Sequence, residues 1–231
     1  MQRTATTDAG WVPLYRLTAW LLAAMVVIIA VQIAIYLAWP PPTTAAGFLE
    51  LVGRNPFLGL LSLDLLYLIQ NLILAVLYVA LFVRLRTDAP TLSALGLVSG
   101  LLGVAAYIPS NPAFELLDLA DAFVGADAEG RAAILAAAEA LMAGYTGTAF
   151  LVYYVLSGIA LLLFAIAILR TTHFSRASGW WGLAAGVLMV VPSPAGMVGM
   201  AFALASLVPW TVFVVLLALR FRKLAAAPVV E

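Results

Sequence analysis

Residues 57–86 read FLGLLSLDLLYLIQNLILAVLYVALFVRLR, and this stretch decides the fold. A helix needs about 20 apolar residues to cross a bilayer, and the stretch is long enough. Asp64, Tyr67 and Asn71 lie within it at the spacing i, i+3, i+7, which predicts one shared face of a helix over 57–84. An ionisable side chain inside a span normally faces protein or a water-filled cavity. We therefore expect the neighbouring helices to cover this polar stripe.

The composition of the whole chain is typical of a polytopic membrane protein. Of its 231 residues, 65% are hydrophobic and 10% are charged, whereas a soluble domain has about 45–50% apolar and about 25% charged residues. The mean hydropathy is +1.12. The formal net charge is zero, so the total charge indicates no nucleic-acid partner. The expected partners are the lipid bilayer and either another membrane protein or further copies of this chain.

The apolar runs predict an all-α bundle of six transmembrane helices in a single integral membrane domain over residues 1–231. The predicted spans are 14–39, 57–84, 91–108, 148–169, 175–195 and 197–219. Three prolines at 40–42 end the first span, and a loop is expected to follow them. The least apolar segment lies between spans three and four. It predicts a small extracytoplasmic cap of two helices, at about 112–124 and 127–143.

The basic residues predict how the bundle is oriented. Two of the eleven Lys and Arg residues, Arg54 and Arg131, fall on one side of the six spans. The other nine fall on the opposite side: Arg3, Arg16, Arg84, Arg86, Arg170, Arg176, Arg220, Arg222 and Lys223. Cytoplasmic loops carry an excess of Lys and Arg, so both termini are expected in the cytoplasm.

A candidate intramembrane polar site consists of Asp64, Tyr67, Asn71 and Gln32, the last being the strongly polar interior residue of the first span. One interpretation is a proton or cation site, with Asp64 loading from outside. The other is a structural cluster that holds helices together, since interhelical polar contacts contribute about 0.6 kcal/mol on average. The structural interpretation is favoured because the other spans supply no second ionisable partner.

Glycines predict where helices approach closely. Gly96 and Gly100 form a small-xxx-small pair in the third span, and Gly182 and Gly186 repeat the Gly-Leu-x-x-Gly pattern in the fifth. Such pairs let a neighbouring backbone or side chain come close. These four residues are the predicted helix-packing glycines.

The residue inventory excludes several kinds of chemistry. The chain has no cysteine, which excludes disulfides, thiolate metal sites and cysteine nucleophiles. Its single histidine, His173, is too few for bis-histidine haem or a three-histidine zinc site. We therefore expect no metal site, no cofactor and no catalytic residue. His173 itself is expected to be a solvated loop residue or a contact for anionic lipid headgroups.

Residues 57–223 resemble a large family of uncharacterised bacterial six-span membrane proteins, which is classed as a domain of unknown function. The similar features are the polar second span with Asn71, the Leu-Arg-Thr turn at 85–87, the glycine pattern at 182–186 and the Val-Pro-Trp step at 208–210. The resemblance implies the fold and a bacterial plasma (inner) membrane. It implies no activity.

The leading functional hypothesis is a non-enzymatic membrane protein that binds, senses or scaffolds. The alternative is a small transporter or proton-coupled carrier that uses the Asp64 stripe. A third hypothesis is a lipid-modifying enzyme, which would need a cleft where Asp64 meets Tyr153, Tyr154 or Ser157.

Overall fold

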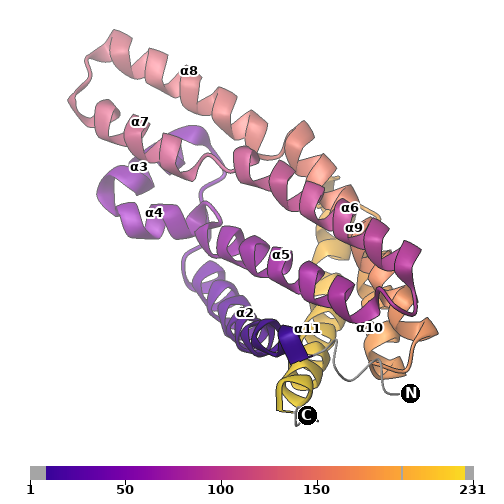
Figure 1. Ribbon diagram of the computed structural model, residues 1–231. Coiled ribbons are helices and arrows are strands. Elements are labelled where there is room, and N and C mark those ends of the chain that lie inside the picture. Colours follow the sequence, from indigo (N-terminus) through magenta and orange to yellow (C-terminus); the bar gives the residue numbers. More distant parts are fainter. Residues whose placement is uncertain (1–8, 194, 227–231) are drawn as a thin grey trace. The chain divides into compact units, whose positions relative to one another are not determined.

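The computed structural model describes residues 9–193 and 195–226, and within those ranges the chain forms helices and turns without a strand (Figure 1). Among the described residues, five segments are long and apolar enough to cross a membrane. They are Val12–Ala38, Leu65–Leu85, Pro90–Gly125, Ala128–Arg170 and Gly196–Ala226. The protein is therefore all-α, and these segments indicate a multi-pass membrane protein in contact with lipid. Arg3 and Pro194 lie outside the described residues.

The helices follow the apolar runs and their capping residues. In chain order they are η1 (Ala9–Trp11), α2 (Val12–Ala38), α3 (Ala45–Arg54), α4 (Pro56–Ser62), α5 (Leu65–Leu85), α6 (Pro90–Tyr107), η2 (Ile108–Ser110), α7 (Ala113–Gly125), α8 (Ala128–Tyr145), α9 (Thr148–Arg170), α10 (Arg176–Leu188) and α11 (Gly196–Ala226). Asp127 caps α8 by accepting a hydrogen bond from the Gly130 amide. Pro209 lies inside α11, and the helix continues through it.

The prediction of a single helix over 57–84 is wrong, because the helix is interrupted at Asp64. Helix α4 ends at Ser62, where the Leu63 amide donates to the Gly59 carbonyl at 3.0 Å. Asp64 then adopts a φ of +60°, the left-handed conformation that commonly ends a helix and that aspartate tolerates better than most residues. Its carbonyl accepts from the Leu68 amide, so Asp64 also starts α5. Asp64 therefore lies at a turn between two helices instead of on a helix face.

The predicted fifth span, 175–195, contains only a short helix. Helix α10 ends at Leu188, and its 13 residues measure about 20 Å at 1.5 Å per residue. The hydrocarbon core of a bilayer is about 30 Å thick, so α10 alone is too short to cross it. Ser175 caps α10 by accepting from the Ser178 amide at 3.1 Å.

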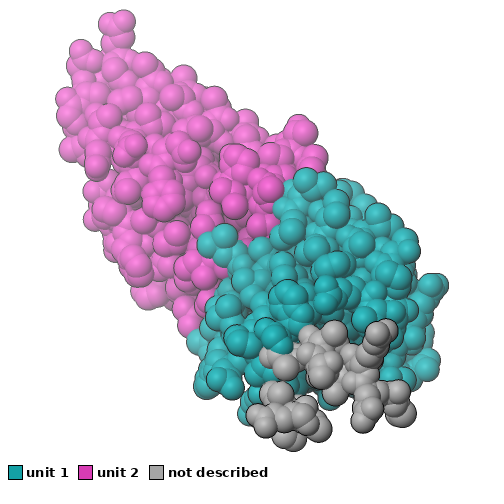
Figure 2. All heavy atoms as spheres, in the orientation of Figure 1, with its two compact units in different colours: residues 1–27, 72–103, 154–231 teal, residues 28–71, 104–153 magenta. Residues whose placement is uncertain are grey.

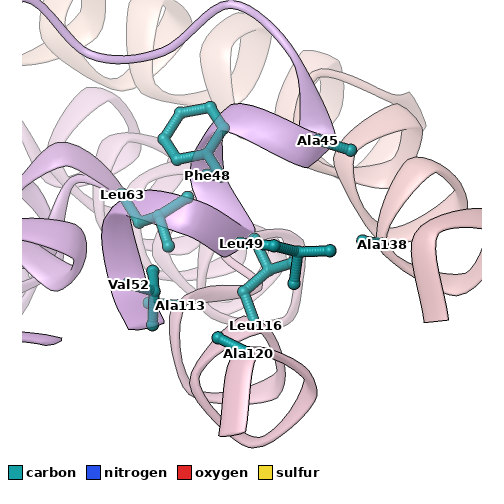
Figure 3. Close-up of a cluster of buried hydrophobic side chains, with 9 residues drawn as sticks. All are labelled: Ala45, Phe48, Leu49, Val52, Leu63, Ala113, Leu116, Ala120 and Ala138. Carbon is teal, nitrogen blue, oxygen red and sulfur yellow. The ribbon is translucent and has the colours of Figure 1, made fainter. Parts of the chain in front are cut away.

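The loop expected after the first span contains a helix, α3, that sequence reasoning missed. Thr44 caps it by accepting from the Gly47 amide at 3.1 Å. Its buried residues recur at i, i+3, i+4 and i+7, which gives an apolar face toward α7 and α8. Figure 3 shows the resulting core of nine side chains: Ala45, Phe48, Leu49, Val52, Leu63, Ala113, Leu116, Ala120 and Ala138. Helices α3, α4, α7 and α8 thus share one hydrophobic core.

The chain divides into two compact units (Figure 2). Unit 1 comprises residues 1–27, 72–103 and 154–231, and unit 2 comprises residues 28–71 and 104–153. In unit 1, helix α10 packs against α11. The ring of Tyr15 at the start of α2 packs against that of Phe221 near the end of α11, with centroids 5.7 Å apart and both residues fully buried.

His173, predicted to be a solvated loop residue or a contact for lipid headgroups, lies in the loop after α9, where it contacts charged side chains of the protein. Its Nδ1 lies 2.7 Å from a guanidinium nitrogen of Arg84, and its Nε2 contacts the carboxylate of Asp88. The Nε of Arg220 donates to the His173 carbonyl at 2.5 Å. Within unit 1, this residue therefore joins the end of α5, the turn after it and the last turns of α11.

Candidate functional site

Hydrogen bonds of the Asn111 side chain stabilise the turn that carries Asp64. The Asn111 Nδ2 donates to the Leu63 carbonyl at 2.8 Å, which satisfies a carbonyl freed by the end of α4. The Asn111 Oδ1 accepts from the Ala113 amide at 3.0 Å, at the start of α7. Because Asn111 is only 7% exposed, both bonds are shielded from water. The start of α7 thus holds the turn in place.

The carboxylate of Asp64 is surrounded by neutral donors from its own chain. The hydroxyl of Tyr36 donates to Oδ1, and that of Tyr145 donates to Oδ2. The amide of Gln32 donates to Oδ1 at 3.1 Å, while its Oε1 accepts from Gln70 at 2.9 Å. We call these five residues the Asp64 cluster. It ties α2, the α4–α5 turn, α5 and the end of α8 together around one acid.

Tyr67 belongs to an aromatic group on the neighbouring turns. Its hydroxyl lies 2.5 Å from that of Tyr153, and its ring meets the ring of Tyr107 edge-on, with centroids 5.3 Å apart. Tyr107 also packs against Tyr153, with centroids 4.9 Å apart. Edge-to-face pairs of this kind stabilise by about 0.5–1.5 kcal/mol beyond their buried area.

Asn71 is completely buried one helical turn further along α5. Its Nδ2 donates to the Tyr67 carbonyl at 3.0 Å. Its Oδ1 has no hydrogen-bond partner among the described residues. A buried acceptor without a partner lowers the stability of a fold by about 1–3 kcal/mol, so this oxygen destabilises unit 2.

The predicted polar residues therefore have different surroundings. The structure brings Gln32 and Asp64 into contact, whereas Tyr67 and Asn71 lie along α5 with partners of their own. Sequence reasoning missed Tyr36, Gln70 and Tyr145. Gln70 was visible as a second amide beside Asn71, but Tyr36 lies near the end of the predicted first span, and no spacing rule links Tyr145 to a residue 81 positions earlier.

The four predicted packing glycines all face a side chain of unit 1. A Cβ atom at Gly100 would lie 2.5 Å from the ring of Tyr78, and one at Gly96 would lie 3.1 Å from Phe164. The rings of Tyr78 and Phe164 stack on each other at 5.8 Å. A Cβ at Gly182 would lie 3.0 Å from Phe213, and one at Gly186 would lie 2.7 Å from Leu162. A larger residue at Gly100 or Gly186 would require the facing side chain to move, and one at Gly96 or Gly182 would require a smaller shift.

Comparison with known families supplies an assignment. Residues 17–221 match the family described as Domain of unknown function (DUF4386). The chain belongs to this family. The match covers most of the chain and confirms the resemblance to a domain-of-unknown-function family. No curated protein and no solved structure matches the chain.

The chemistry that the Asp64 cluster can perform follows from its donors. In this DUF4386 protein the two tyrosine hydroxyls and the glutamine amide all donate to the carboxylate, and none of them carries a charge. Both carboxylate oxygens are occupied. No group of three or more His, Cys, Asp or Glu side chains is placed to hold a metal ion within residues 9–193 and 195–226. The cluster is therefore suited to joining helices or to holding a single proton.

Proposed function

We propose that this DUF4386 protein is a non-enzymatic, multi-pass membrane protein that binds or scaffolds another membrane component, and that Asp64 stabilises its fold. The observation that carries the proposal is that both oxygens of the Asp64 carboxylate accept hydrogen bonds from side chains of the protein, namely Tyr36, Tyr145 and Gln32. A carrier site must exchange its hydrogen-bond partners for substrate or water. Here the partners are side chains from separate elements of unit 2, so releasing them loosens the fold.

The same proposal includes six crossings of a bacterial plasma membrane, with both termini in the cytoplasm. The uneven distribution of Lys and Arg supports it, because nine of the eleven fall on one side. Five long apolar helices supply five crossings. The remaining crossing is the predicted fifth span, in which the described residues 189–193 extend the chain beyond the end of α10.

The absence of cysteine from the sequence makes this topology easy to test. A single cysteine is introduced at Glu129 or at Lys223, and intact cells are treated with a membrane-impermeant maleimide. We expect Glu129→Cys to be labelled in intact cells and Lys223→Cys only after lysis. Labelling of both in intact cells would contradict the topology.

The test of the functional proposal is proton entry into proteoliposomes. The full-length protein is reconstituted with a pH-sensitive dye inside, and the outside is acidified. We expect the wild type, Asp64→Asn and the control Glu129→Gln to match protein-free liposomes. Faster proton entry in the wild type, lost in Asp64→Asn and kept in Glu129→Gln, would overturn the proposal.

A proton-coupled carrier is the second candidate, and two observations favour it. All partners of Asp64 in its cluster are neutral, so the carboxyl can gain or lose a proton without breaking an ion pair. The buried Oδ1 of Asn71 has no partner among the described residues and can accept a hydrogen bond from a bound group. The proteoliposome experiment separates the two candidates, because only the carrier predicts a flux that depends on Asp64.

A further inference from the structure

Unit 1 contains a groove whose chemistry differs from that of the Asp64 cluster. It has a volume of about 400 Å³ and lies between the first turns of α2 and the last turns of α11. Its walls are mostly apolar and include Trp20, Ala23, Ala218 and Leu219. Volumes of about 300–1,000 Å³ are usual for sites that bind small molecules or part of a larger one.

Two arginines line the same groove. Arg16 is contributed by α2 and Arg222 by α11, and both are exposed. Tyr15 and Phe221, whose buried rings pack together, immediately precede Arg16 and Arg222 in the sequence, so the two arginines lie at neighbouring positions of α2 and α11. Two guanidinium groups held beside an apolar channel make a site with one cationic end.

The remaining walls suit a hydrocarbon chain. Trp20 is 73% exposed and Leu219 is 44% exposed, so both side chains are accessible to a hydrocarbon chain in the groove. Ala23 lies about 10 Å along α2 from Arg16 at 1.5 Å per residue. A ligand with an anionic group at Arg16 and an apolar chain running toward Ala23 would cover all of these surfaces.

We propose that this groove binds an anionic phospholipid, with the phosphate between Arg16 and Arg222 and one acyl chain along Trp20, Ala23 and Leu219. Charge complementarity carries the proposal. Basic groups at helix ends attract anionic lipid headgroups, and the paired guanidinium groups can each bind phosphate oxygens. The groove is too small for a whole phospholipid, so the rest of the lipid stays in the surrounding bilayer. This site is separate in residues and chemistry from the Asp64 cluster, so it goes beyond the proposed function.

The experiment is native mass spectrometry of the full-length protein in detergent, titrated with dioleoylphosphatidylglycerol, dioleoylphosphatidylcholine or inorganic phosphate. We expect one molecule of phosphatidylglycerol to bind at least tenfold more tightly than phosphatidylcholine. An arginine near the membrane surface contributes about a fivefold gain in affinity, so Arg16→Gln with Arg222→Gln should weaken phosphatidylglycerol binding by about 25-fold. Arg16→Lys with Arg222→Lys should weaken phosphatidylglycerol binding by less than fivefold.

The matched control is Arg54→Gln with Arg131→Gln, which removes the same charge elsewhere and should change the affinity less than twofold. If the glutamine pair fails to fold, Ala23→Leu with Ala218→Leu fills the groove, and we expect it to weaken binding at least tenfold. Equal binding of the two lipids, equal loss in the control pair, or competition by millimolar phosphate would each overturn the proposal.

Discussion

Replacing Asp64 separates what its backbone contributes from what its side chain contributes. Asp64→Gly keeps the left-handed turn, since glycine adopts a positive φ freely, but removes the acceptor of three hydrogen bonds. Hydrogen bonds between membrane helices contribute about 0.6–1 kcal/mol each, so we expect Asp64→Gly to lower the free energy of unfolding by about 2–3 kcal/mol. Asp64→Ala should cost about 1 kcal/mol more, because alanine is strained at a φ of +60°.

Asp64→Asn is the conservative variant. Asparagine tolerates the left-handed conformation and keeps one carbonyl oxygen, so we expect a loss of about 1 kcal/mol. The assay is equilibrium unfolding in detergent micelles, followed by tryptophan fluorescence. The expected order of stability is wild type, Asn, Gly and then Ala. A glycine variant as stable as the wild type would refute the reasoning, because the carboxylate would then contribute nothing.

Three further predictions use the same unfolding assay. Gly100→Ala should destabilise by about 1–3 kcal/mol because its Cβ would lie 2.5 Å from the Tyr78 ring, whereas Gly144→Ala, with open space around it, should be neutral or slightly stabilising. An equal effect at both glycines would contradict this. Asn111→Ala should lower the free energy of unfolding by about 1–3 kcal/mol, because the Leu63 carbonyl at the end of α4 loses its donor. An unchanged unfolding midpoint would show that water replaces the Asn111 amide. His173→Ala should cost about 1 kcal/mol through the lost Arg84 contact, and no change would mean that the contact is not formed in solution.

Much of the helical structure could be predicted from local sequence. Long apolar runs identify α2, α6, α9 and α11, because only a helix of that length satisfies its own backbone in lipid. Asp127 marks the start of α8 as a capping residue. Helix α3 was missed because its apolar face has only four residues, and the three prolines before it suggested a loop.

The arrangement around Asp64 could not be predicted, for two physical reasons. The positive φ at Asp64 depends on packing and on the Asn111 bond, and an unbroken apolar run gives no sign of it. The tyrosines that meet the carboxylate come from elements 28 and 81 positions away, so their contact is a tertiary event. Periodicity placed Asp64, Tyr67 and Asn71 on one face, but periodicity holds only while the helix continues.

The coupling between Asp64 and Tyr145 gives the most direct test that one acid holds these elements together. A double-mutant cycle compares Asp64→Gly, which removes the acceptor and keeps the turn, Tyr145→Phe and the double variant with the wild type in the unfolding assay. We predict a coupling free energy of about 1 kcal/mol or more between these two residues. Effects that add to within about 0.3 kcal/mol would contradict a hydrogen bond between them and, with it, the structural role of Asp64.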